Sequence, residues 1–249
     1  MEVIKIVGYH CHVGSQVFNE EGNVYLDAAT IMLKFFADMY HKYDVKAEIL
    51  NMGGGFGVRY VDTDPYLDID ANIKTLADHI KDIADKLGIP MPKILMEPGR
   101  SIVAAAGITL YTVGCVKEIE NVRTYVSIDG GMCDNPRYIL YGSKYTAVLA
   151  NNASAEPVAP ITIAGKCCES GDLIQEHVMM PQIHVGDTLA VLATGAYNYS
   201  MSSNYNRIPR PPIVAVSGNE AKIIVKRETY DDLIKNDVLE EFCCFIKHR

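Results

Sequence analysis

Along the first hundred residues, short apolar runs alternate with longer segments in which apolar positions recur every three or four residues. The short runs are of strand length and comprise Glu2 to Val13, Lys46 to Leu50 and Pro92 to Met96. The segments between them, residues 25–43 and 73–87, have the period of amphipathic helices. Asp70 can cap the second helix and Gly88 can end it. Strand, helix, strand, helix and strand in this order predict parallel βα units.

The pattern changes after about Ala106, where short β-type runs are separated by turn residues. These runs are residues 108–116, 124–128, 158–164, 188–193 and 213–216. They are typical of an antiparallel β-sandwich or barrel, interrupted by two short helical pieces at 135–141 and 230–237. The fold class is therefore α/β plus all-β, with one domain at 1–106 and a β domain at 107–249.

Polar residues and glycines gather where each of the three predicted strands ends, which is where a βα barrel builds its active site. The first strand ends in His10 and His12, followed by Ser15. Two histidines on one side of a strand suit a metal, but no acidic partner stands nearby, so we predict no metal. Gly53 to Gly55 follow the second strand. Without a Cβ, they let several amides approach a phosphate, although a tight turn is the simpler interpretation.

Glu97 and Arg100 follow the third strand, in the sequence Glu-Pro-Gly-Arg. One interpretation is a structural ion pair between the two side chains. The other is a carboxylate partner for a cationic heterocycle, with Arg100 binding a phosphate or a carboxylate. The residues alone leave both interpretations open.

The second half of the chain carries three further candidate segments. Arg137 and Tyr141 are four residues apart, so one helical face could present both to a carboxylate, or simply to solvent. Cys168 lies beside Glu169 in a glycine-containing loop, where a buried structural cysteine is the alternative. Residues 195–211 are rich in tyrosine and asparagine, and poor in aliphatic residues. Such a segment suits an ordered loop around a ligand better than a core.

Composition narrows the class of protein. The chain has 249 residues, of which 49% are hydrophobic and 22% charged, as in soluble globular proteins. A net charge of -8 without a basic run argues against nucleic acid as a partner. The most apolar window, residues 101–116, is shorter than the roughly 20 residues that span a bilayer, so no membrane segment is expected. Seven cysteines without zinc-type spacing, and no signal-peptide pattern, favour reduced thiols in the cytoplasm.

Six segments, in order, resemble the alanine-racemase-like (fold type III) pyridoxal-phosphate-dependent decarboxylases, most closely those that act on diaminopimelate. They read HCHVGSQ, NMGGGFG, EPGRSIV, DGGMCDNPRYILYG, CCESGD and GAYNYSMSSNYNRIPRP. The resemblance covers nearly the whole chain. It departs at Tyr138, where the family commonly has proline. It implies pyridoxal 5'-phosphate as the cofactor, and the last three βα units of a TIM-type barrel followed by a C-terminal β domain.

The same resemblance assigns the cofactor site. His12 would stack on the pyridoxal ring, and Glu97 would pair with the pyridine nitrogen and keep it protonated. Ser15 and the glycine loop would hold the phosphate, while Arg100 would reach both phosphate and substrate. The cofactor-binding residues implied are His12, Ser15, Gly53, Gly54, Gly55, Glu97, Gly99, Arg100 and Tyr197.

The substrate site follows in the same way. Arg137 and Tyr141 would bind the distal carboxylate of diaminopimelate, and Glu169 its distal amine. Cys168 would return a proton to Cα from a neighbouring subunit, with His12 and Glu97 as the other catalytic residues. Arg100 and Tyr197 would complete the substrate site. The implied reaction converts meso-2,6-diaminopimelate to L-lysine and CO2 in lysine biosynthesis, because an arginine-tyrosine pair would not suit a bare ammonium.

The family's cofactor-linking lysine belongs to a segment N-terminal to the matching motifs. Only three βα units precede the β domain here, whereas a closed barrel has eight. We therefore expect activity to need the missing segment, and the partner to be a second copy or a complementary N-terminal chain. Two alternatives stay open: a decarboxylase of the ornithine, arginine or carboxynorspermidine type, and a non-catalytic subunit that regulates a full-length homologue.

Overall fold

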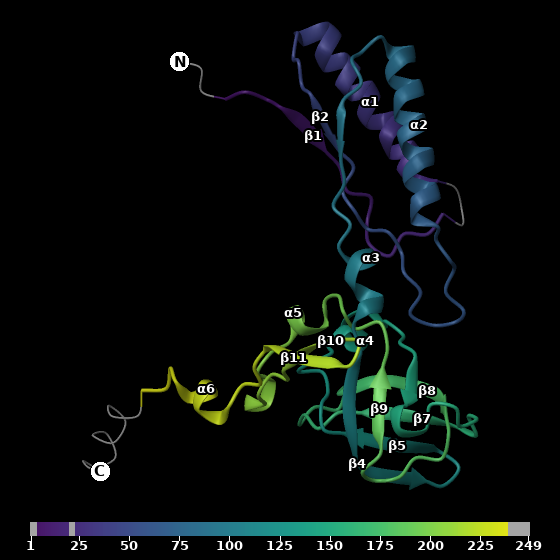
Figure 1. Cartoon of the computed structure of the whole chain (residues 1–249), viewed down its shortest axis with the longest axis vertical. Helices are drawn as coiled ribbons and strands as arrows, with labels where there is room; N and C mark the ends of the chain where they lie inside the picture. The colour runs from purple at the N-terminus through teal and green to yellow at the C-terminus, as the bar shows by residue number, and fades with distance from the viewer. Residues whose placement is uncertain (1–3, 20–22, 239–249) are drawn as a thin grey trace. The chain divides into compact units, whose positions relative to one another are not determined.

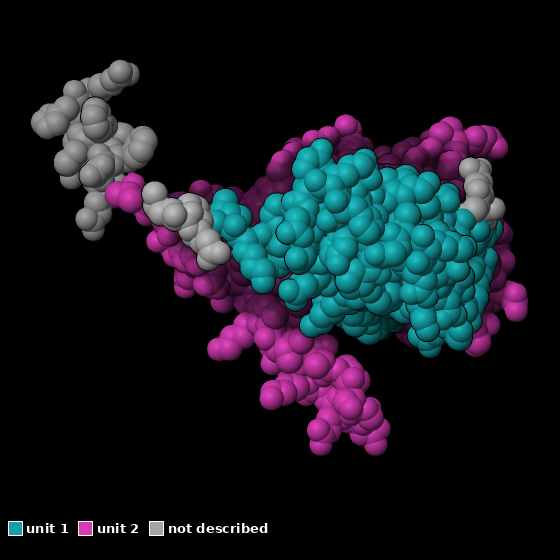
Figure 2. All heavy atoms as spheres, turned by 90° about the horizontal axis from the view of Figure 1, so that it is seen from above, with its two compact units in different colours: residues 1–108, 192–196 teal, residues 109–191, 197–249 magenta. Residues whose placement is uncertain are grey.

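The computed structural model describes residues 4–19 and 23–238 (Figure 1). They form two compact units, coloured separately in Figure 2. We call residues 1–108 with 192–196 the α/β unit, and residues 109–191 with 197–249 the β unit. The α/β unit therefore includes a short segment from far along the chain.

Three parallel strands and two long helices are the main elements of the α/β unit (Figure 1). The strands are β1 (Gly8–His10), β2 (Ile49–Asn51) and β3 (Lys93–Leu95), and the helices are α1 (Val24–Tyr43) and α2 (Ile69–Leu87). β2 pairs in parallel with both neighbours, so Leu50 lies between Tyr9 and Ile94. The predicted parallel βα order is confirmed. Of the predicted first strand, Glu2 and Val3 lie outside the described residues.

Side-chain caps define both helices. The Asn23 side chain accepts hydrogen bonds from the first turn of α1. Asp68 caps α2 by accepting from the Ala71 N–H at 3.0 Å, so the predicted cap at Asp70 is wrong and the helix starts four residues earlier. A carboxylate must precede the first helical residue to reach an N–H two or three positions on, and Asp70 lies inside the first turn. Gly88 ends α2 with φ +64°, as predicted.

The core of the α/β unit connects α1 to the glycine loop. Fully buried side chains of α1, α2 and β2 pack together, with Leu33, Leu50 and Ile80 at its centre. The ring of Tyr25 stacks on Phe56 with 4.8 Å between centroids. Its hydroxyl donates to the Gly54 carbonyl at 3.2 Å. Helix packing therefore fixes the position of the loop that follows β2.

The β unit contains a six-stranded sheet in the order β6-β9-β4-β5-β7-β8 and a separate hairpin, β10-β11. The strands are β4 (Thr109–Ile119), β5 (Arg123–Ile128), β6 (Ala147–Leu149), β7 (Ala159–Ala164), β8 (Leu173–Met180), β9 (Thr188–Val191), β10 (Ile213–Ser217) and β11 (Glu220–Val225). Edge strands β6 and β8 also contact each other, so the sheet curls on itself. All pairs are antiparallel except β5 and β7. The purely antiparallel prediction is wrong there, because residues 129–158 cross over between those strands.

Three strands escaped sequence prediction. β6 is only three residues long, of which Leu149 is buried, and β11 is exposed along most of its length, so neither carries a recognisable apolar pattern. β8 carries Gln175, Glu176 and His177 at its centre, and His177 has a left-handed φ of +55°. A strand is predicted from alternating apolar and polar residues. β8 buries Ile174, Val178 and Met180, but Glu176 interrupts that apolar series in the sequence.

Short helices complete the architecture. In the α/β unit these are α3 (Arg100–Val103) and η1 (Ala104–Ala106); in the β unit, α4 (Arg137–Tyr141), η2 (Ala150–Asn152), α5 (Asn198–Met201), η3 (Tyr205–Arg207) and α6 (Tyr230–Ile234). The two predicted short helices are confirmed as α4 and α6, each slightly shorter than expected. Within 4–19 and 23–238, no helix has the length and apolarity needed to cross a membrane.

Candidate active site

Backbone hydrogen bonds bring the ends of β1, β2 and β3 together beyond the strands themselves. The Cys11 N–H donates to the Asn51 carbonyl at 2.9 Å, and the Met52 N–H to the Leu95 carbonyl at 3.0 Å. The Glu97 N–H donates to the Gly53 carbonyl at 2.7 Å. The residues that follow the three strands therefore meet at one edge, as expected for parallel strands.

The glycine loop is packed too closely for side chains. A Cβ on Gly54 would collide with the Glu97 carbonyl, and a Cβ on Gly55 with the Gly14 carbonyl. Gly53 and Gly55 also have φ of +68° and +94°. The Gly53 N–H donates to the Asn51 side chain at 2.9 Å, so this amide is engaged within the protein. Close packing alone thus requires these glycines, and phosphate binding by the loop stays a prediction.

Glu97 is a half-exposed carboxylate held in a fixed place. Its Oε1 accepts from Asn51 Nδ2 at 2.7 Å and lies 3.7 Å from His10 Nε2, while 54% of its side chain is exposed. The Asn51 amide can point only one way, because its Oδ1 accepts from the Gly53 N–H. Asn51 was not singled out from the sequence, since an asparagine beside a glycine loop usually indicates only a turn.

Arg100 lies buried at the start of α3, with 7% of its surface exposed. It donates to the Ser15 hydroxyl at 2.8 Å and to the Tyr60 hydroxyl at 2.6 Å. Gly99, which precedes it, is exposed. Tyr60 was also missed from the sequence, because it lies far along the chain from the residue that it braces. Arg100 and Ser15 thus place a guanidinium and a hydroxyl side by side, a donor set that suits a phosphate.

The ring of His12 is oriented by the glycine loop. Its Nδ1 accepts from the Gly54 N–H at 3.2 Å. A nitrogen that accepts carries no proton, so in the neutral ring the proton lies on Nε2. The residue is exposed, which leaves the ring available for stacking.

Arg137 is buried between two tyrosines in the β unit. Its Cζ lies 5.2 Å from the ring centroid of Tyr141 and 5.4 Å from that of Tyr197. The structure thus places Arg137 and Tyr141 on one face of α4, as their spacing predicts, and adds Tyr197 from far along the chain. The guanidinium also donates to the Ser143 hydroxyl at 3.4 Å. Its contact with a substrate carboxylate stays a prediction.

The Cys168–Glu169 loop is tied to the turn that contains Tyr205 and Asn206. The Cys168 N–H donates to Asn206 Oδ1 at 2.7 Å, and the Tyr205 hydroxyl donates to Glu169 Oε2 at 3.2 Å. Hydrogen bonds from the Gly171 N–H and the Tyr205 hydroxyl hold the pKa of Glu169 below its usual value. Cys168 is exposed, and its neighbour Cys167 is the buried thiol.

One buried carboxylate joins the two loops that carry the predicted substrate residues. Asp172 accepts from the Met132 N–H and the Cys167 N–H, both at 2.6 Å. The first bond reaches the segment before Arg137, and the second reaches the segment before Cys168. Only 4% of Asp172 is exposed. Asp172 therefore holds the two loops in place relative to each other within the β unit.

Asp134, in the first of these loops, is expected to titrate near pH 6. Burial raises its pKa from 3.8 to about 6, against the hydrogen bond from the Tyr111 hydroxyl at 2.6 Å. The folded chain then binds this proton more tightly than the unfolded chain. The stability contributed by Asp134 is thus full below about pH 4 and is lost as pH rises through about 6. Carboxyl carbon NMR across this range measures the midpoint.

A variant and an internal control test the interpretation of the Asp134 titration. Tyr111→Phe removes the donor that lowers the pKa, so the midpoint should rise further. Asp187 serves as the control in the same spectra, because a hydrogen bond from the His184 N–H holds its pKa below the usual value. A midpoint for Asp134 close to 4 would contradict this interpretation.

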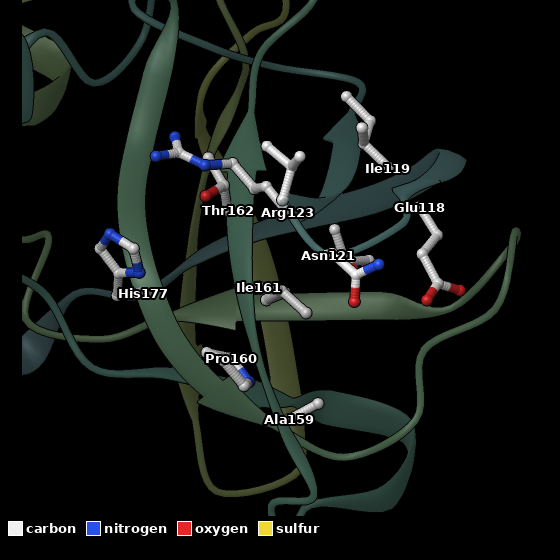
Figure 3. A pocket seen from close by; sticks show the side chains of 11 residues that line it. Glu118, Ile119, Asn121, Arg123, Ala159, Pro160, Ile161, Thr162 and His177 are labelled. Atoms are coloured by element: carbon white, nitrogen blue, oxygen red, sulfur yellow. The ribbon is translucent and has the colours of Figure 1, made fainter.

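Described residues of the β unit line at least two pockets. One is lined by residues of and between β4, β5, β7 and β8, among them Arg123, Thr162 and His177 (Figure 3). It contains none of the predicted site residues. The other is lined by Lys166, Cys168, Asn206, Arg207, Pro209 and Tyr230, among others. No group of three or more histidine, cysteine or acidic side chains suited to a metal occurs in the part of the chain that the structure describes.

Comparison with known proteins identifies related sequences and structures. Residues 1–104 match the family described as "Pyridoxal-dependent decarboxylase, pyridoxal binding domain". Diaminopimelate decarboxylase of Bacillus subtilis is 46% identical over 95% of this chain and 54% of its own length. The Staphylococcus aureus enzyme of that name is 45% identical over 94% of this chain and 54% of its own length.

A solved structure agrees with the sequence matches. The crystal structure of diaminopimelate decarboxylase from M. jannaschii in complex with L-lysine superposes with a TM-score of 0.84 and 33% identity. The match covers 95% of this chain and 52% of that one. The chain thus spans about half the length of the relatives it matches.

Proposed function

Because this chain belongs to the diaminopimelate decarboxylase family, we propose that it forms part of an enzyme that converts meso-diaminopimelate to L-lysine and CO2. One observation carries the proposal. The edge where β1, β2 and β3 end presents an oriented carboxylate, Glu97, together with His12 and the Arg100–Ser15 pair. The lysine bound to the M. jannaschii relative supports the same product.

The donor set at this edge fits pyridoxal phosphate. Bound there, the cofactor would supply an electron sink for decarboxylation at Cα. Glu97 would hold a proton at the pyridine nitrogen, since a fixed negative charge favours the cationic ring. His12 would stack on the ring. Arg100 and Ser15, with Gly53 to Gly55 and Gly99, would bind the phosphate.

The β unit would supply recognition of the distal end of the substrate. Arg137 carries a permanent charge and is held between two aromatic rings, so it suits a carboxylate and disfavours an ammonium. Tyr141 would share that carboxylate, and Glu169, ionised at neutral pH, would take the distal amine. Tyr197 would line the same pocket. Cys168 would give a proton to Cα of a substrate bound to a neighbouring subunit.

We further infer that the α/β unit is the end of a TIM-type barrel and the β unit the C-terminal domain of the enzyme. β1 and β3 are the outer strands of its three-stranded sheet. Unpaired strand edges recruit other strands. The partner would be a second copy or a complementary lysine-bearing N-terminal chain, in the cytoplasm. The chain would also bind an amino-acid substrate. Neither nucleic acid nor a membrane is expected as a partner.

The proposal predicts activity on complementation. The chain, co-expressed with the lysine-bearing N-terminal half of a diaminopimelate decarboxylase, should release CO2 and lysine from meso-diaminopimelate when pyridoxal phosphate is added. The chain alone should bind the cofactor weakly and without a covalent link, as borohydride reduction followed by mass spectrometry would report. Turnover of ornithine or arginine instead would favour the alternative substrate class. A complex that forms without any turnover would favour the non-catalytic regulator.

A further inference from the structure

The turn at Tyr205–Arg207 has an unusual backbone. Asn206 and Arg207 have φ of +54° and +55°, in the left-handed region that residues with a side chain rarely adopt. Asparagine tolerates this region better than most residues, but two such residues in succession need support from their surroundings. Side-chain contacts within the β unit supply this support.

In this conformation the turn makes two hydrogen bonds to the Cys168–Glu169 loop. Asn206 Oδ1 accepts from the Cys168 N–H at 2.7 Å, while the Tyr205 hydroxyl donates to Glu169 Oε2 at 3.2 Å. Two successive residues of the turn thus hold two successive residues of the loop. The bond to Cys168 is made to its backbone, so it fixes the position of the residue and leaves the thiol unengaged by this contact.

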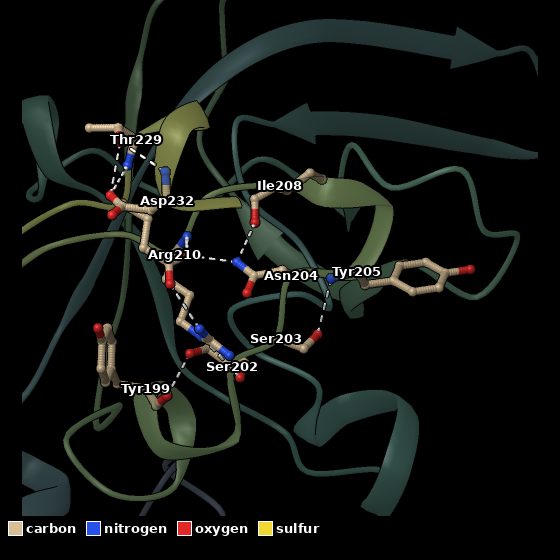
Figure 4. A network of polar contacts seen from close by, with 10 residues as sticks. Tyr199, Ser202, Ser203, Asn204, Tyr205, Ile208, Arg210, Thr229 and Asp232 are labelled. Carbon is tan, nitrogen blue, oxygen red and sulfur yellow. Dashed lines mark hydrogen bonds and ion pairs between the residues drawn. The ribbon is translucent and has the colours of Figure 1, made fainter. Parts of the chain in front are cut away.

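The turn is itself held from its C-terminal side. Arg210 donates to Glu228 Oε1 at 2.9 Å, and Asn204 Nδ2 donates to Glu228 Oε2 at 2.6 Å. The Asn204 amide also donates to the Ile208 carbonyl at 3.1 Å, which closes the turn around Asn206 (Figure 4). The Glu228 carboxylate is mostly buried, with 25% of its side chain exposed.

Arg207 adds a second attachment. Its guanidinium contacts both oxygens of Asp237, at 2.7 and 3.2 Å. A bidentate arginine-carboxylate contact fixes the orientation of the guanidinium as well as its distance from the carboxylate. Two arginine-carboxylate pairs, Arg207 with Asp237 and Arg210 with Glu228, therefore attach the turn and the segment after it to later parts of the chain. This framework can maintain the left-handed backbone at Asn206.

We propose that the Tyr205–Asn206 turn is a positioning element of the decarboxylase, in which Asn206 sets the place of Cys168 and Tyr205 sets the carboxylate of Glu169. The inference rests on the function proposed above. Delivery of a proton to carbon needs the donor within a few tenths of an ångström of its productive place. The loop that carries the thiol continues through Ser170 and Gly171, which provide little stiffness of their own. The turn would supply it.

Substitutions at Asn206 separate the hydrogen bond from the backbone conformation. Asn206→Gly keeps the left-handed backbone and removes the acceptor, whereas Asn206→Asp keeps both. Asn121→Gly is the matched control, because Asn121 has φ of +59° in the turn between β4 and β5 and is not part of the proposed site. Each variant is made in the full 249-residue chain and in the complemented enzyme.

The first readout needs no catalysis. Iodoacetamide labelling of Cys168, followed by peptide mass spectrometry, should be about threefold faster or more in Asn206→Gly, because the loop loses its anchor. Cys115 is also exposed and serves as the internal reference within the same molecule. Asn206→Asp should restore most of the wild-type rate, and Asn121→Gly should match the wild type.

The second readout uses the complemented enzyme. Asn206→Gly should lower kcat about tenfold or more while KM changes little, since only proton delivery is displaced. Tyr205→Phe should instead raise KM for diaminopimelate. In the pH profile of kcat/KM, the acid limb of this variant should also shift to higher pH, because the pKa of Glu169 rises when the hydrogen bond from the Tyr205 hydroxyl is lost.

The outcomes separate the two proposals. Unchanged labelling and unchanged kcat in Asn206→Gly would overturn the positioning role, as would an Asn206→Asp variant as impaired as Asn206→Gly. A wild-type complex without turnover on diaminopimelate would overturn the proposed function instead, and labelling of Cys168 alone would then decide whether the turn holds the loop.

Discussion

Glu97→Gln is expected to lower kcat for diaminopimelate about a hundredfold, or about 2.7 kcal/mol of barrier, in the enzyme complemented with its lysine-bearing half. Glutamine keeps an Oε1 that can accept from Asn51 Nδ2, the bond that measures 2.7 Å to Glu97. The substitution therefore removes the charge and keeps the geometry. If Glu97 pairs with the cofactor as proposed, the pyridine nitrogen would lose its proton more readily without that charge, and the ring would be a poorer electron sink.

Cofactor binding should survive in this variant, because in the proposed site Arg100 and Ser15 would hold the phosphate end independently of Glu97. Steady-state kinetics with a fluorescence titration of pyridoxal phosphate separates the two effects. Glu48→Gln is the matched control, since Glu48 is a 76% exposed carboxylate of the same unit, paired with Lys5. If kcat stayed near the wild-type value, Glu97 would be a structural partner of Asn51 and His10 rather than a group that acts on the cofactor.

Arg137→Met is expected to raise KM for diaminopimelate roughly 10- to 100-fold, which corresponds to about 1.4–2.7 kcal/mol of lost binding. Methionine can fill much of the space that the arginine stem occupies between the rings of Tyr141 and Tyr197, so the loss reports the charge more than a cavity. Discrimination against amino acids that lack the distal carboxylate should relax, because the proposed contact of Arg137 with that group would be lost.

Competition between diaminopimelate and lysine-like amino acids measures this selectivity directly. Arg123→Met is the matched control, because Arg123 also lies over a tyrosine, 5.6 Å from the ring centroid of Tyr125, and is paired with Glu176. It lies outside the proposed site. Should Arg137→Met lower only the thermal midpoint and leave selectivity intact, Arg137 would be a packing residue of α4.

Periodicity in the sequence determined the elements that bury one face. Both long helices and the three parallel strands follow from the spacing of apolar residues, because burial against a core imposes that spacing. The same argument explains the failures. β8 buries Ile174, Val178 and Met180, but the polar residues at its centre break the apolar alternation. β11 is exposed, so no buried face shaped its sequence. The parallel pairing of β5 and β7 depends on a long crossover, which no local pattern records.

The motifs located the candidate site, and only the tertiary structure decided what holds each side chain. Glu97 and Cys168 could be singled out from short segments, because their chemistry is visible in residue type and neighbouring glycines. Their supports could not, since Asn51 lies 46 positions from Glu97, and Asn206 38 positions from Cys168. Hydrogen bonds between distant segments form only once the strands and loops are packed together. Residue type therefore fixes what a group can do, and packing fixes where it can do it.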